Sequence, residues 1–116
     1  ARISLPWPAR TLHPNSRKHW RQVRRAAKSA KELAHWTMKE AGVRPIQPRP
    51  VLISIDFFPP DNRRRDLDGM ISSMKAALDG VADALGIDDN LFRIAAKKSQ
   101  DTFPGGAVIV EISEAV

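Results

Sequence analysis

Residues 51–58 constrain the fold most strongly, because large apolar side chains occupy every second position of this segment. The apolar residues are Val51, Ile53, Ile55 and Phe57. Side chains alternate between the two faces of a β-strand, so the pattern predicts a strand with one strongly apolar face. Such a face has to be covered by a second layer of secondary structure. The rest of the chain must therefore supply elements that pack against residues 51–58.

Two segments with helical spacing meet this need. Residues 17–41 carry apolar side chains at intervals of three and four, which predicts a long helix that is capped at Asn15-Ser16 and ends at Gly42. Residues 69–85 show the same spacing and predict a second helix that stops at Gly86. The apolar positions are Trp20, Val23, Ala27, Ala30, Leu33, Thr37 and Ala41 in the first segment, and Ile71, Met74, Leu78, Val81 and Leu85 in the second.

The ends of the chain favour strands. Residues 2–5 alternate and stop at a proline, which predicts a short first strand. Residues 92–99 and 107–112 flank a Pro-Gly-Gly turn, and we predict that they pair as a β-hairpin. The predicted order is thus β-α-β-α-β-β. We expect a single α/β domain over residues 1–116, with one small sheet of about four strands packed by two helices.

Charge is divided unevenly along the chain. Residues 1–50 hold 12 Lys and Arg against 2 acids, a net charge of +10, whereas residues 51–116 hold 7 against 11, a net charge of −4. A basic half beside an acidic cluster suits a protein that holds a polyanion near a cation site, and nucleic acid is the common polyanion. The alternative is a basic surface that is merely solvated.

Other features of the composition narrow the class of protein. No stretch approaches the roughly 18 consecutive apolar residues that a membrane span needs. The absence of cysteine excludes disulfides and thiolate zinc sites and suits a reducing cytosol. The three histidines lack metal-ligand spacing, so we expect no zinc. We expect a cytoplasmic protein, encoded by a bacterium or a phage, that uses no membrane and no small-molecule cofactor.

Four acids near the second predicted helix are the candidate chemistry. Asp66 and Asp68 precede the helix, and Asp88 and Asp89 follow it. If residues 66–68 are extended, the first two carboxylates project to the same side. The two pairs could then converge at the ends of the helix or across a dimer. Such oxygen ligands suit a hard divalent ion, which activates a water next to a phosphate. The alternative makes Asp68 an N-cap and Asp88-Asp89 a solvated turn.

Basic residues accompany the acids. Arg63, Arg64 and Arg65 stand immediately before Asp66 and are candidates for contacts with the DNA backbone. The long helix adds a second basic group of candidate phosphate contacts, namely Arg17, Lys18, Arg21, Arg24 and Arg25. Trp20 and Trp36 on that helix are expected in the core or in a dimer contact in preference to base stacking.

The order of these motifs resembles the RusA family of Holliday-junction resolvases, which are crossover junction endodeoxyribonucleases. The family shows an Arg-rich run leading into Asp-Leu-Asp-Asn, then a helix with a Lys, and then an Asp-Asp pair before a strand. The corresponding segments here are RRRDLDG at 63–69, MKAALDGVADALGIDDNLF at 74–92, and the opening LPWP at 5–8. The similarity covers nearly the whole chain and is weakest over residues 9–50.

The resemblance implies an α/β homodimer that binds four-way DNA junctions and nicks opposed strands symmetrically with Mg²⁺ or Mn²⁺. It matches Asp66, Asp68 and Asp89 to the metal-binding acids, Asp88 to an accessory acid, and Lys75 to the basic residue that supports the transferred phosphate. Paired cuts in a two-fold symmetric junction are what a homodimer supplies. The alternatives are a branched-DNA-binding protein without catalysis and a structure-specific nuclease acting on flaps.

The chain departs from the family pattern at two positions. Gly69 stands where many relatives have Asn, which removes a side-chain hydrogen bond. Lys75 lies seven residues after Asp68, where the best-known pattern has four. Both spacings return to nearly the same face of a continuous helix, so Lys75 is expected to point toward the acids. A surface pair between Lys75 and Asp79 is the alternative.

Overall fold

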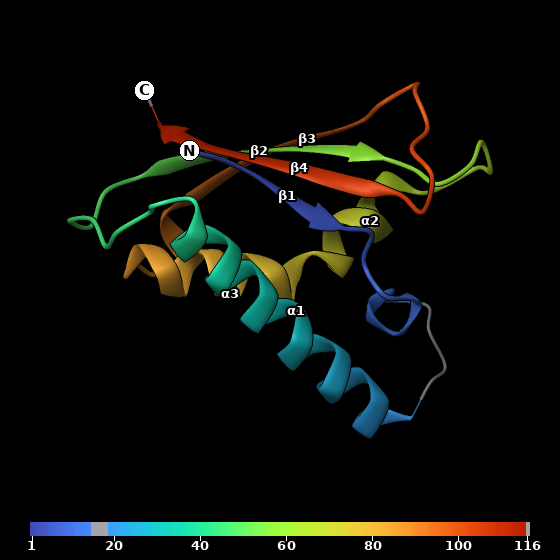
Figure 1. Cartoon of the computed structure of the whole chain (residues 1–116), viewed down its shortest axis with the longest axis horizontal. Helices are drawn as coiled ribbons and strands as arrows, with labels where there is room; N and C mark the ends of the chain where they lie inside the picture. Colours follow the sequence, from blue (N-terminus) through green and yellow to red (C-terminus); the bar gives the residue numbers. More distant parts are fainter. Residues whose placement is uncertain (15–18, 116) are drawn as a thin grey trace.

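The computed structural model describes residues 1–14 and 19–115, and it confirms an α/β fold with one four-stranded sheet. The strands lie in the order β1-β4-β2-β3, and the helices cover one face of the sheet (Figure 1). The elements are β1 (Arg2–Pro6), η1 (Arg10–Leu12), α1 (Trp20–Glu40), β2 (Val51–Phe58), α2 (Leu67–Ser73), α3 (Lys75–Leu85), η2 (Asp89–Leu91), β3 (Phe92–Lys98) and β4 (Ala107–Glu114). No helix in the described ranges is long and apolar enough to cross a membrane.

Strand β2 lies inside the sheet as its alternation predicts. Val51, Ile53, Ile55 and Phe57 are all buried against the helical layer. The apolar side chains of α3 belong to the same core, and Leu78, Val81 and Leu85 are buried as predicted. Gly86 ends α3 with a φ of +69°, and its backbone N–H donates to the carbonyl of Asp83, as a C-terminal glycine cap does.

The predicted β-hairpin of residues 92–99 and 107–112 is wrong. Strand β3 pairs with β2 in parallel, whereas β4 pairs antiparallel with β1 and with β2. Strand β2 therefore lies between the two expected partners. The reason is burial: β2 buries every second residue and takes a central position, whereas β3 buries only Phe92 and lies at the edge.

The predicted helix over 69–85 is two helices. Helix α2 begins earlier, at Leu67, and the chain breaks its helical geometry at Met74, with φ −90° and ψ −2°. Immediately before the break, the hydroxyl of Ser73 donates to the carbonyl oxygen of Gly69, one turn earlier, at 2.8 Å. Serine bonds of this kind compete with the helical ladder and bend helices. Residues 1–14 and 19–115 therefore contain three α-helices where two were predicted.

Helix α1 begins at Trp20 with His19 as its N-cap, and the predicted cap at Asn15-Ser16 lies outside the described residues. The predicted apolar stripe of α1 is confirmed only in part, since Val23, Ala27, Ala30 and Thr37 are half-buried. The buried residues of α1 are instead Ala34 and Met38, while Leu33 is exposed. Helices α1 and α3 approach so closely that an added Cβ at Gly80 of α3 would collide with the carbonyl oxygen of Lys31 in α1. Small residues at this contact therefore determine which face of α1 is buried.

The two tryptophans of α1 do not belong to the core. Trp20 is 55% exposed and Trp36 is 62% exposed, so the prediction of core packing is wrong for both. Because α1 meets α3 through small side chains, its large aromatic residues are turned away from that contact.

Candidate functional site

The loop between β2 and α2 is held in place by Trp7, which follows β1. The Trp7 ring meets the ring of Phe57 edge-on, with centroids 6.0 Å apart and planes at 76°. The guanidinium carbon of Arg65 lies 5.5 Å from the centroid of the Trp7 ring. Trp7 thus joins the first strand, the second strand and the arginine run. Sequence analysis missed this role, because the partners of Trp7 are distant along the chain and no local pattern marks them.

Asp61 is the centre of hydrogen bonding in this loop. Its carboxylate accepts from the Arg65 guanidinium at 2.9 Å and from the backbone N–H of Arg63 at 3.0 Å. The Arg65 hydrogen bond and then the Arg63 hydrogen bond lower the pKa of Asp61 below its usual value. Since the pKa is lowered by folding, the ionised carboxylate favours the folded loop above its usual pKa, and this contribution is lost as the pH falls through the lowered value.

Asp66 and Asp68 do not form the extended pair that sequence analysis expected. Asp66 is the N-cap of α2, and its two carboxylate oxygens accept from the backbone N–H groups of Asp68 and Gly69, each at 3.3 Å. Asp68 instead belongs to the first turn of α2, where its side chain is exposed. The cap is therefore Asp66 and not Asp68. Both carboxylates lie at the amino-terminal end of α2, where negative charge stabilises the helix through its dipole.

Gly69 is buried beneath the imidazole of His13. A Cβ at this position would collide with the Nε2 atom of His13, so no side chain fits here unless His13 moves. The place of the missing Asn side chain is thus filled by a histidine from the segment after η1. Sequence analysis did not pair His13 with Gly69, because their separation of more than fifty residues leaves no spacing to detect.

Asp88 and Asp89 lie at the other end of the helical layer. Asp88 caps η2 by accepting from the backbone N–H of Asn90 at 2.9 Å, and Asp89 is the first residue of η2. Because β2 and β3 are parallel, the chain leaves β2 at one end of these strands and has to return to the opposite end before it enters β3 (Figure 1). The seven residues of β3 correspond to about 20 Å.

One chain therefore does not bring the three predicted metal ligands together. Asp66 and Asp68 lie beyond the carboxyl end of β2, whereas Asp89 lies before the amino end of β3. Within residues 1–14 and 19–115 no group of three His, Asp or Glu side chains is placed to hold a metal ion. This geometry does not bring the two acid pairs together within one chain.

Lys75 is the first residue of α3 and is exposed. The break at Met74 separates it from the helix that carries Asp68, so helical periodicity no longer relates the two side chains. The alternative of a surface pair is not observed either, since the ion pairs of the described residues do not include Lys75 with Asp79.

The three arginines of the loop differ in exposure. The side chain of Arg65 is 19% exposed and donates to the carbonyl oxygens of Asp61 and Arg63, at 3.0 and 3.2 Å. Arg63 is mostly exposed, and its Nε lies 3.7 Å from Asp61. Arg64 is exposed and makes no hydrogen bond or ion pair to the described residues. Arg64 is thus the arginine best placed for an external anion, whereas Arg65 stabilises the loop.

The arginines of α1 form a second exposed basic group. Arg21, Arg24 and Arg25 are exposed on the first two turns of the helix. Arg17 and Lys18, which belong to the same predicted group, lie outside the described residues.

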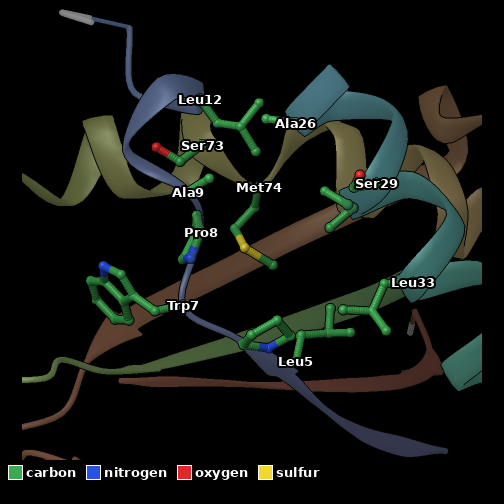
Figure 2. A pocket seen from close by; sticks show the side chains of 13 residues that line it. Leu5, Trp7, Pro8, Ala9, Leu12, Ala26, Ser29, Leu33, Ser73 and Met74 are labelled. Carbon is green, nitrogen blue, oxygen red and sulfur yellow. The ribbon is translucent and has the colours of Figure 1, made fainter. Parts of the chain in front are cut away.

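The apolar cavity between β1, η1, α1 and the α2–α3 junction has a volume of about 220 Å³ (Figure 2). Trp7, Leu12, Leu33 and Met74 line it, and Ser29 and Ser73 add two hydroxyls but, among the described residues, no charged side chain borders it. Because it contains no charged group, this cavity is not suited to hold a phosphate.

Arg64→Ala and Arg65→Ala are expected to separate binding from stability. Arg64→Ala should weaken affinity for duplex and branched DNA to a similar extent and reduce the slope of log affinity against log salt by about 1, with unchanged thermal stability. Arg65→Ala should destabilise the fold by about 1 kcal/mol, because a charged donor is lost from two backbone carbonyls near the surface. Salt-dependent anisotropy titrations and thermal melts measure the two effects. Equal salt slopes for Arg64→Ala and the wild type would exclude a phosphate contact at Arg64.

Comparison with known proteins finds a relative of this chain in Xylella fastidiosa. No protein-family model matches the chain. The chain is 35% identical over 115 residues to an uncharacterized protein of Xylella fastidiosa (strain Temecula1 / ATCC 700964), and the match covers 96% of this chain and 74% of that protein. The chain therefore belongs to the same family as the Xylella protein.

Proposed function

We propose that the protein is a divalent-metal-dependent endodeoxyribonuclease of the RusA type, which cuts four-way DNA junctions as a homodimer in recombination and repair. The observation that carries the proposal is the loop at the start of α2. Two acids, Asp66 and Asp68, follow directly on Arg64, whose guanidinium has no partner among the described residues. An anion-binding side chain next to a pair of carboxylates is the combination that a phosphodiesterase needs at one place.

A single chain does not fit a magnesium ion held by three acids. It offers Asp66 and Asp68 at one end of the helical layer and Asp89 at the other. In a two-fold symmetric dimer whose α2–α3 stretches run antiparallel, Asp89 of one copy approaches the first turn of α2 in its partner. Two equivalent acid groups then arise, each built from both copies. This arrangement gives the two symmetry-related sites that paired nicks in a junction require.

A second candidate function is the binding of branched DNA without catalysis. It is favoured by the local roles of two of the acids, since Asp66 caps α2 and Asp88 caps η2. In this case the acids serve folding alone, and the arginines account for all interaction with DNA.

One experiment separates the candidates. A labelled four-way junction, a flap and a linear duplex are incubated with the protein at one salt concentration, with and without magnesium. The proposal predicts paired nicks in the junction that depend on magnesium and little cutting of the other substrates. Tight junction binding with every strand intact would support the non-catalytic function. If the flap were cut in preference to the junction, the flap and not the junction would be the substrate.

A further inference from the structure

The first half of α1 extends beyond the sheet and beyond α3 (Figure 1), while its Ala26, Ser29 and Ala30 face β1 and η1 across the apolar cavity. Both fully buried residues of α1, Ala34 and Met38, belong to its second half. A helix of 21 residues is about 31 Å long. Packing against α3 therefore accounts for only part of its length, and the first three turns present most of their side chains to solvent.

Trp20 opens this exposed half of the helix, and its neighbours are cationic or aromatic. The guanidinium carbons of Arg21 and Arg24 lie 5.4 and 5.5 Å from the centroid of the Trp20 ring. The ring of His19 lies 5.5 Å away with its plane tilted by 31°. Trp20 is 55% exposed and does not pack against the apolar core. Its position is therefore not explained by folding.

The charge around Trp20 has one sign. Between positions 21 and 31 the helix carries five cations and no acid. The cations are Arg21, Arg24, Arg25, Lys28 and Lys31. Trp36, the other exposed tryptophan of α1, has surroundings of mixed charge, because Glu32 and Asp83 border the same hollow as its ring together with Lys28 and Lys31. A polyanion is thus attracted to the Trp20 end of the helix more strongly than to the Trp36 end.

We propose that Trp20 is a stacking site for an unpaired nucleotide base, with Arg21 and Arg24 contacting the phosphates on either side of it. An aromatic ring beside guanidinium groups is the usual means by which proteins hold single-stranded nucleic acid, and stacking accepts any base. Bases inside a duplex are already stacked on both faces and do not reach Trp20. The site therefore gives a preference for unpaired segments, such as those at a branch point. This inference rests on the DNA-binding part of the proposed function and not on cleavage.

The test measures binding in the presence of a metal chelator, so that catalysis does not contribute. Anisotropy titrations use a short labelled oligothymidylate and a perfectly paired duplex of equal length. Trp20→Ala should weaken binding of the single strand by about 10-fold or more and binding of the duplex by less than about 2-fold. Trp20→Phe should keep much of the single-strand affinity. Trp36→Ala is the matched control, and it should leave both affinities unchanged.

Several outcomes would overturn the assignment. Equal losses on both substrates would mean that Trp20 only shapes the basic helix, and equal losses in Trp20→Ala and Trp36→Ala would mean that any exposed tryptophan of α1 has the same effect. A change in sedimentation behaviour of Trp20→Ala without DNA would assign the ring to a contact between copies of the chain. If the wild type binds as predicted but fails to cut junctions, the stacking site stands and the nuclease proposal fails.

Discussion

Asp68→Asn is expected to reduce junction cleavage by about 100-fold or more, which corresponds to about 2.7 kcal/mol of transition-state stabilisation. The carboxylate of Asp68 is exposed in the first turn of α2 and makes no hydrogen bond or ion pair to the described residues, so its effect on folding is limited to a small interaction with the helix dipole. Its loss should leave thermal stability nearly unchanged. Junction affinity should stay the same or rise, because less negative charge faces the phosphates. Single-turnover cleavage and anisotropy binding on one junction measure both quantities.

Asp101→Asn is the matched control, because it removes the same charge from an exposed loop far from α2 in the sequence. It should cut at the wild-type rate. Asp66→Asn tests whether Asp66 serves only as the N-cap of α2 or also takes part in cleavage. Asparagine is as good an N-cap as aspartate, so the helix should remain while the charge is lost. Near wild-type cleavage by Asp68→Asn would remove this residue from the site.

Gly80→Val is expected to destabilise the protein by at least about 3 kcal/mol, a large part of the 5–15 kcal/mol that holds a typical domain folded. A Cβ at Gly80 would collide with the carbonyl oxygen of Lys31 and would lie 3.1 Å from the Cβ of Ala34. The obstacle is the backbone of α1, which cannot rotate away as a side chain can. The two helices would have to separate, and the core beneath them would open.

Urea unfolding measures this loss, and Ala76→Val is the control. Ala76 lies one turn earlier on α3 and is only half-buried, so the substitution adds the same branched side chain at a cost of about 1 kcal/mol or less. If Gly80→Val were no more destabilising than Ala76→Val, the close approach of α1 and α3 would not be a feature of the folded protein.

Local patterns predicted the elements of this fold better than their arrangement. The alternation in residues 51–58 predicts a strand because it depends only on neighbours along the chain, and Gly86 marks a helix end for the same reason. The pairing of β3 with β2 depends instead on which strands bury the most apolar surface, and adjacency along the chain is no guide to that. The choice of the buried face of α1 was predicted incorrectly for a related reason. Its face is chosen by Gly80, a residue of another helix.

The candidate site shows the same division. The residue types and their order predicted an acidic centre beside arginines, and Asp66, Asp68 and Arg64 do lie close together along the loop and the first turn of α2. The separation of Asp89 could not be predicted, because it follows from the parallel pairing of β2 and β3. His13 and Trp7 had no local signal at all. Their partners are brought to them only by the folded chain.

The proposal that two copies share each acid group is tested most directly by mixing two inactive variants. Asp68→Asn and Asp89→Asn proteins are unfolded together in equal amounts, refolded and assayed for nicking of a four-way junction with magnesium. Half of the resulting dimers contain one chain of each kind, and each of these has one acid group with Asp68 and Asp89 both intact, so the mixture should recover about a quarter of wild-type nicking. A mixture that stays as inactive as the separate variants, while the wild type cuts, would contradict the shared site.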